Sequence, residues 1–128
     1  MSGFGDYIRA ARTSRAAVDE RFSLRQVARR IGVEPAYLSK VERGLVPPPS
    51  EETIARLATD LGENPDLLLA LAGKVSSDLQ ATILRRPKEF AELIRQLKDA
   101  PEHAILKVVR VVRDGNWGRP VKGRGGVG

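Results

Sequence analysis

The chain has 128 residues, of which 41% are hydrophobic, 30% charged and only 5% aromatic. This hydrophobic share is enough for the core of one domain, or of a small domain with an appendage. Because aromatic residues are scarce, the core must come mainly from Leu, Ile, Val and Ala, which favours packed helices over sheets. The absence of cysteine excludes disulfides, thiolate metal ligands and cysteine nucleophiles.

The net charge of +6 and the pI near 10.2 favour an anionic partner. Residues 1–43 hold nine Lys/Arg against five Asp/Glu, residues 44–73 hold one against five, and residues 74–128 hold twelve against six. Two basic blocks therefore flank an acidic one. The first residues carry charge where a signal peptide needs an apolar run, and no window approaches the roughly 18 apolar residues of a membrane span. We expect a cytoplasmic protein with no membrane segment.

The first helix is predicted over residues 4–15. Its apolar residues recur at helical spacing: Phe4, Tyr7, Ile8 and Ala11. Two alternatives remain open for the segment between Arg12 and Ser23, which either extends this helix or forms a loop.

Capping signals indicate two short helices in residues 23–44. Ser23 with Gln26 three residues later is a capping box, and Gly32 is a left-handed stop. Pro35 suits the first position of the next helix, which ends at Gly44. The inward-facing positions of the two helices are apolar: Leu24, Val27, Ala28, Ile31, Leu38 and Val41. A turn this tight favours helices that cross.

Two further helices complete a first domain at residues 1–73. Ser50 and Asn64 are their caps, and Gly62 and Gly73 are their stops. Residues 74–117 are predicted to form a helical appendage punctuated by Pro87, and residues 118–128 a flexible basic Gly-rich tail. The expected fold is all-α throughout.

The segment FSLRQVARRIGVEPAYLSKVERG resembles the helix-turn-helix of the phage repressor and Cro-like regulators, the Xre family. Ala28 matches the small position where the two helices touch, Gly32 the turn, and Glu42, Arg43 and Gly44 the ending. The resemblance implies a five-helix repressor-like DNA-binding domain with its helix-turn-helix at residues 23–44. It also implies that Glu42 pairs with an arginine of the first helix, for which Arg12 is the match.

The second helix of this motif fits the major groove, where each base pair shows a distinct pattern of donors and acceptors. With Leu38 inward, its outward residues are the base-contact candidates: Glu34, Ala36, Tyr37 and Lys40. Lys40 suits guanine, Glu34 the cytosine amino group and Ala36 a thymine methyl, whereas Tyr37 alternatively reaches a phosphate.

Other residues near the motif are candidates for contact with the DNA backbone: Ser23, Leu24, Arg25, Pro35, Ser39 and Arg43. Contacts of this kind position a protein on DNA without specifying a sequence. Ser39 is equally suited to packing, and Arg29 and Arg30 are interpreted as a solvated face.

No catalytic residue, metal site or cofactor is expected. His103 is the only histidine, and Asp99 and Glu102 do not complete a known metal-ligand arrangement with it. No Ser/His/Asp order is apparent, and the glycine-rich end lacks the strand and helix of a phosphate loop.

A single helix-turn-helix reads few base pairs, so we expect a homodimer on double-stranded DNA, acting as a repressor at a palindromic operator. Two alternatives remain open. In the first, the protein acts through its appendage, from Leu79 to Trp117, which binds a toxin or a metalloprotease. In the second, the basic carboxyl half of the chain binds nucleic acid without sequence preference.

Overall fold

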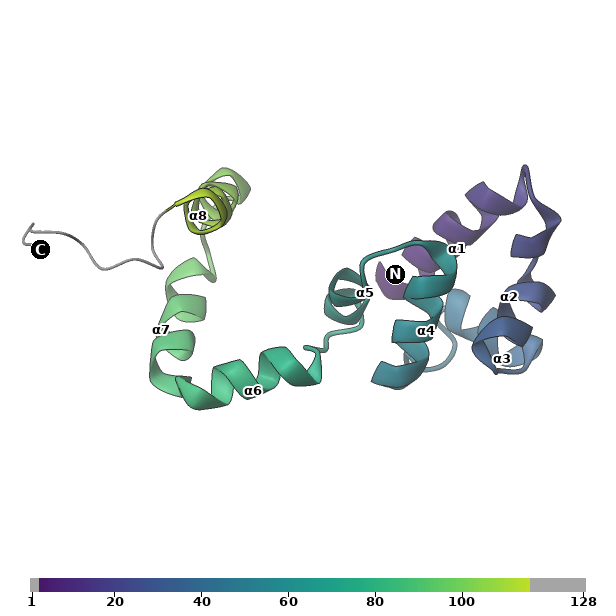
Figure 1. Cartoon of the computed structure of the whole chain (residues 1–128), viewed down its shortest axis with the longest axis horizontal. Helices are drawn as coiled ribbons and strands as arrows, with labels where there is room; N and C mark the ends of the chain where they lie inside the picture. The colour runs from purple at the N-terminus through teal and green to yellow at the C-terminus, as the bar shows by residue number, and fades with distance from the viewer. Residues whose placement is uncertain (1–2, 116–128) are drawn as a thin grey trace, which may run out of the picture. The chain divides into compact units, whose positions relative to one another are not determined.

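The computed structural model describes residues 3–115, which are helical throughout and contain no strand (Figure 1). The predicted all-α fold is confirmed. The elements are α1 (Gly3–Ala16), the 3-10 helix η1 (Glu20–Phe22), α2 (Leu24–Ile31), α3 (Pro35–Glu42), α4 (Glu51–Leu61), α5 (Pro65–Leu71), α6 (Ser77–Arg85), α7 (Pro87–Leu97) and α8 (Glu102–Asp114).

Packing divides the chain into two units, Met1–Thr82 and Ile83–Gly128. Hydrogen bonds to Pro49 and Glu51 hold the segment after α5 within the first unit. The ammonium of Lys74 donates to the carbonyl of Pro49 at 2.9 Å, and the hydroxyl of Ser77 donates to Glu51 at 2.9 Å. The expected domain limits at residues 73 and 117 stay a prediction, and the expected tail lies outside the described residues.

The helix ends of the first unit follow the predicted capping chemistry. Ser23, Ser50 and Asn64 each accept a backbone hydrogen bond at the start of α2, α4 and α5. Gly32 and Gly62 end α2 and α4 in the left-handed conformation. Local side-chain chemistry therefore sets where these helices begin and end.

One detail at the start of α2 differs from the predicted capping box. The Ser23 hydroxyl accepts from the Gln26 N–H at 3.2 Å, but the Ser23 N–H donates to the carbonyl of Glu20 at 3.1 Å. The 3-10 turn before α2 thus takes the place of a Gln26 side-chain bond. The segment before Ser23 combines both open alternatives, because α1 continues to Ala16 and η1 follows it.

The core of the first unit consists of apolar side chains from all five of its first α-helices, each removed from water almost completely. These are Phe4, Ile8, Val27, Ala28, Ile31, Leu38, Val41, Ile54, Leu57, Ala58, Leu61, Leu68 and Leu69. Burying one such large side chain contributes about 1.5–3 kcal/mol. α2 packs against α3 and α4, and α1 packs against α3 and α5, so α3 rests on two helices.

In the second unit, α7 and α8 bury no residue among those that the structure describes. Their amphipathic sequences nevertheless place Leu, Ile and Val at helical spacing, and all of these side chains except Leu97 are exposed to solvent. Among residues 83–115, the second unit therefore has no fully buried side chain.

Substituting Gly32 by Ala should lower the free energy of unfolding by about 1 kcal/mol. Gly32 has φ 79°, which costs an L-residue about 1–2 kcal/mol, offset in part by the lower entropy of the unfolded alanine chain. A Cβ there would meet no atom within 4 Å, so the cost comes from the backbone alone. Urea denaturation measures it.

Gly3→Ala is the matched control, because its Cβ would make an ordinary contact with Leu71 at 3.9 Å within a helix. That variant should be as stable as the parent or more so. Equal stability of the Gly32 variant and the parent would contradict the assigned role of Gly32.

Candidate nucleic-acid interface

The turn between α2 and α3 is tight. Gly32 caps α2, the Val33 N–H donates to the carbonyl of Ala28 at 3.0 Å, and Pro35 opens α3. Proline at this position has a preset φ and lacks the N–H that would otherwise be unpaired. α3 therefore begins three residues after Gly32, and α2 and α3 form a helix-turn-helix.

α3 is fixed to the domain by packing and by one buried ion pair. Leu38 and Val41 face the core, and Glu42 is 4% exposed. The Arg12 guanidinium, from α1, donates to the two carboxylate oxygens of Glu42 at 2.7 and 2.9 Å. It also donates to the carbonyl of Phe22 at 3.2 Å. The predicted pairing of Arg12 with Glu42 is confirmed, and it joins α1, η1 and α3.

The outer side of α3 presents three of the four base-contact candidates. Glu34, Ala36 and Lys40 are exposed. Tyr37 differs from the expectation that it faces outward with them, since its side chain is half-buried and packs against the core. The reason is helical spacing, because Tyr37 lies four residues before the buried Val41 and shares its side of the helix. Whether Tyr37 contacts DNA stays a prediction.

The candidates for backbone contact fall into two groups. Arg25 and Arg43 are exposed, whereas the remaining four are half-buried: Ser23, Leu24, Pro35 and Ser39. Leu24 packs against the core. The Arg43 guanidinium donates to the hydroxyl and the carbonyl of Ser39, both at 3.3 Å. Arg43 is thereby held at the carboxyl end of α3, and no carboxylate in the described part of the chain forms an ion pair with it.

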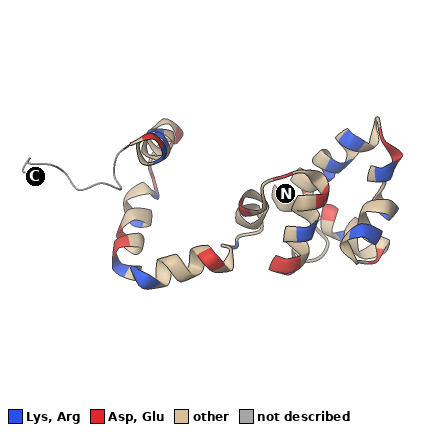
Figure 2. Cartoon of the chain, in the orientation of Figure 1, with Lys and Arg blue, Asp and Glu red and all other residues tan. Residues whose placement is uncertain are grey.

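Ion pairs neutralise some of the basic residues of the first 43 positions but not others. Four arginines pair with carboxylates: Arg12 with Glu42, Arg15 with Glu63, Arg21 with Asp19 and Arg30 with Asp60. Within residues 3–115, no carboxylate forms an ion pair with Arg9, Arg25, Arg29, Lys40 or Arg43. Arg9 lies on α1, and the other four lie on α2 and in the last part of α3 or directly after it. Figure 2 colours the Lys and Arg positions of these helices blue. Four of these five uncompensated cations therefore lie on the helix-turn-helix.

Arg29 is exposed, as its interpretation as part of a solvated face predicts, but sequence reasoning did not place it beside the start of α3. Together with Arg25 it lines a hollow of about 340 Å³ whose other walls are Val33, Glu34 and Pro35. The hollow thus joins exposed cations of α2 to the start of α3. The spacing of four residues between Arg25 and Arg29 places them on one face of a helix, which is the signal that points to Arg29 as a partner of Arg25.

Arg30 is exposed, as a residue of a solvated face would be, but its guanidinium is also paired. Its guanidinium donates to the two oxygens of Asp60 at 2.5 and 3.1 Å, and it lies 5.2 Å from the centroid of the Phe22 ring. The hydrogen bond to Asp60 raises the pKa of Arg30 above its ordinary value. Arg30 therefore links α2 to α4.

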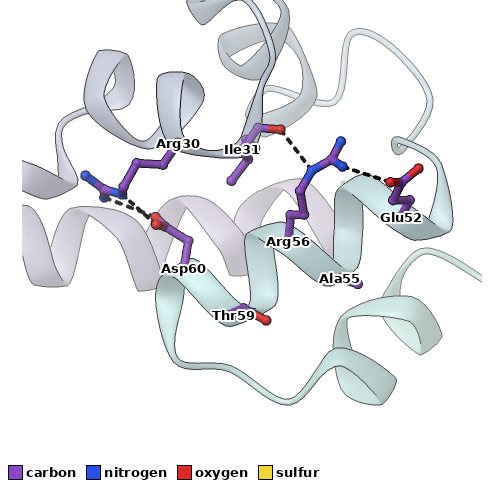
Figure 3. Close-up of a pocket in the computed structure, with 7 residues that line it drawn as sticks. All are labelled: Arg30, Ile31, Glu52, Ala55, Arg56, Thr59 and Asp60. Carbon is purple, nitrogen blue, oxygen red and sulfur yellow. Dashed lines mark hydrogen bonds and ion pairs between the residues drawn. The ribbon is translucent and has the colours of Figure 1, made fainter.

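A second hollow, of about 520 Å³, lies between α2 and α4 (Figure 3). Arg30 reaches Asp60 at one end, and Arg56 donates to the carbonyl of Ile31 at 3.2 Å and to Glu52 at 3.0 Å. Each cation that lines it is matched by a carboxylate. This hollow differs from the one beside Arg29, where neither lining arginine has a carboxylate partner among the described residues.

A family model described as a helix-turn-helix domain matches residues 4–71, which is more than half of the chain. The chain belongs to this helix-turn-helix family. The matched residues extend from the start of α1 to the end of α5, the region that forms the buried core. No curated protein and no solved structure matches the chain. Membership makes it a DNA-binding regulator, a class that is typically non-enzymatic.

Within residues 3–115, no helix has the length and apolar character needed to cross a membrane. No group of three His, Cys, Asp or Glu in that range is arranged to hold a metal ion.

Glu42→Ala should lower the free energy of unfolding by about 3–5 kcal/mol. The change would leave the Arg12 guanidinium without its carboxylate, although the side chain of Arg12 is only 11% exposed. Glu52→Ala is the control, since it breaks the exposed pair with Arg56 and should cost at most about 1 kcal/mol. Urea denaturation compares the two, and similar costs would show that the Arg12–Glu42 pair does not anchor α3.

Proposed function

We propose that this helix-turn-helix protein is a sequence-specific transcriptional repressor of the Xre, or Cro-like, type, which binds a palindromic operator as a homodimer. The observation that carries the proposal is the placement of uncompensated charge. Arg25, Arg29, Lys40 and Arg43 lack carboxylate partners among the described residues, and they border the exposed edge of α3. Phosphates are the natural counter-charges for such a surface.

In this proposal the exposed edge of α3 reads the major groove. Lys40 donates to O6 and N7 of guanine, Glu34 accepts from N4 of cytosine, and Ala36 contacts a thymine methyl. Ala36 and Lys40 are four residues apart, so they share one face of the helix. No side chain caps the start of α3, which leaves the Glu34 carboxylate available to a base.

The cations around this edge position the domain on the DNA backbone. Arg25 and Arg29 lie beside the start of α3, and Arg43 lies at its end. Contacts with phosphate set register and orientation and lose affinity as salt rises. Three arginines at the two ends of α3 would hold the helix along the groove.

Two copies account for the specificity that a single motif lacks. Two recognition helices related by a two-fold axis enter successive major grooves about 34 Å apart, so the operator is expected to be palindromic. Occupation of such a site within a promoter represses transcription, and DNA as the ligand implies a cytoplasmic location.

The test is a selection of bound sequences from random DNA, followed by titration of the selected operator with variants. Lys40→Ala should weaken binding by about 1–3 kcal/mol and relax the preference at one base position in each half-site. Arg25→Ala should weaken all sequences alike and lower the slope of affinity against salt by about 1.

Arg21→Ala is the matched control, because Arg21 is exposed but its charge is already met by Asp19 at 2.8 Å. It should bind the operator as the parent does. The proposal fails when selection yields no common sequence, or when the Lys40 and Arg25 variants lose the same affinity on every sequence.

A further inference from the structure

The second unit contains an apolar surface that its two complete helices, α7 and α8, do not bury. α7 and α8 together supply ten Leu, Ile, Val and Phe side chains, none of them buried. They are Phe90, Leu93, Ile94, Leu97, Ile105, Leu106, Val108, Val109, Val111 and Val112. The core of the first unit holds thirteen buried apolar side chains. Two copies of α7 and α8 therefore offer more apolar side chains than that core contains.

α8 shows most clearly that a partner is needed. Its apolar side, around Val108, Val109 and Val112, is flanked by Val111 and Leu106, and its polar side holds Lys107 and Arg110. An apolar face this wide occurs on helices that are covered by neighbours. A helix of 13 residues is also marginally stable in water without tertiary packing.

We infer that α7 and α8 of two copies of this chain pack on each other, with the two α8 helices antiparallel about a two-fold axis near residues 107 and 108. The inference rests on the homodimer of the proposed function and names the surface that forms it. The centre of a stable homodimer interface is mainly apolar, and α7 and α8 supply ten apolar side chains to it from each copy.

The charges beside the apolar side of α8 select a second copy in the antiparallel direction. Glu102 and Arg113 are separated by eleven residues, which is about three helical turns, so both lie on the same flank. In an antiparallel pair related by a two-fold axis, the same flank of each helix lies along one edge of the interface, and the two flanks run in opposite directions. Glu102 of each protomer then lies beside Arg113 of its partner, which gives two equivalent ion pairs.

A parallel pair would be electrostatically worse. A parallel pair would place Glu102 of one helix at the same height as Glu102 of the other. Lys107, Arg110 and Arg113 would likewise lie at the same height as the identical cations of the partner, so like charges would repel each other. The two helix dipoles would also point in the same direction. Within one chain, Arg113 bonds Asp114 at 2.9 Å, and both side chains are more than 60% exposed. An exposed pair of this kind holds its partners weakly, so Arg113 is free to pair with Glu102 of a partner.

Disulfide trapping tests the direction of pairing on the full chain, which has no cysteine of its own. Val108→Cys lies near the two-fold axis and should form a homodimeric disulfide under mild oxidation. In an antiparallel pair centred between residues 107 and 108, position 104 of one α8 faces position 111 of the other. Ala104→Cys and Val111→Cys should therefore each run as a monomer in denaturing gels when oxidised alone. The two variants should form a crosslinked dimer when they are mixed and then oxidised. Equal homodimeric crosslinking at all three positions would overturn the antiparallel arrangement.

The mass in solution tests the surface itself. The full chain should have twice the mass of one 14.0 kDa chain, and Val109→Glu should reduce it to that of a single chain. Val18→Glu is the matched control, because Val18 is 89% exposed in the first unit, and that variant should remain dimeric. A monomeric parent, or a Val109 variant that stays dimeric, would refute the inference.

DNA binding separates the failure of this inference from the failure of the proposed function. The Val109 variant should lose tight binding to a two-half-site operator and keep the weak binding of the parent to a single half-site. Dimers that survive the Val109 change and bind the operator would refute the surface alone. Absence of sequence preference in every variant, whatever the mass and crosslinking results, would refute the proposed function alone.

Discussion

The Arg12–Glu42 ion pair is the interaction on which the DNA-facing geometry depends. Glu42 ends α3, Arg12 comes from α1, and the same guanidinium donates to the carbonyl of Phe22. A single side chain therefore satisfies one buried carboxylate and one backbone carbonyl from different elements. Removing a charge from water is costly unless its hydrogen bonds are met, so this pair favours one placement of α3 over its alternatives. Burial of Leu38 and Val41 stabilises the packing of α3 on the core, whereas the ion pair fixes the orientation of α3 relative to α1.

The domain also sorts its charges, so that the arginines that join its helices differ from those proposed to contact DNA. Arg30 joins α2 to α4 through Asp60, and Arg12 joins α1 to α3. Arg25 and Arg29 lie on the same short helix as Arg30 but line a hollow with Val33, Glu34 and Pro35, and neither forms an ion pair with a carboxylate of residues 3–115. Net charge alone does not make this distinction. The acidic block on α4 and α5 contributes to it, because Asp60 and Glu63 each pair with an arginine of an earlier helix.

Sequence alone was sufficient wherever the decisive chemistry is local. The caps at Ser23, Ser50 and Asn64 and the stop at Gly32 depend on residues within one turn, and all four are present as expected. The Arg12–Glu42 pair came from a resemblance to a family. The Arg30–Asp60 pair spans thirty residues and depends on how α2 meets α4, which no local pattern encodes. The partial burial of Tyr37 was missed for a similar reason. Tyr37 lies next to the buried side of α3, and whether such a side chain packs inward depends on the tertiary contacts around it.

The start of α3 has a consequence for how wrong sequences would be rejected. Glu34 precedes Pro35, makes no capping bond and stays exposed beside two unneutralised arginines. In a groove, its carboxylate would lose water and be repelled by phosphate and by base acceptors unless an amino group met it. The Glu34 carboxylate at the start of α3 would thus weaken binding to incorrect sites more than it would strengthen binding to the correct one. Discrimination would then come from the cost of a mismatch, while the surrounding arginines supply attraction to any DNA.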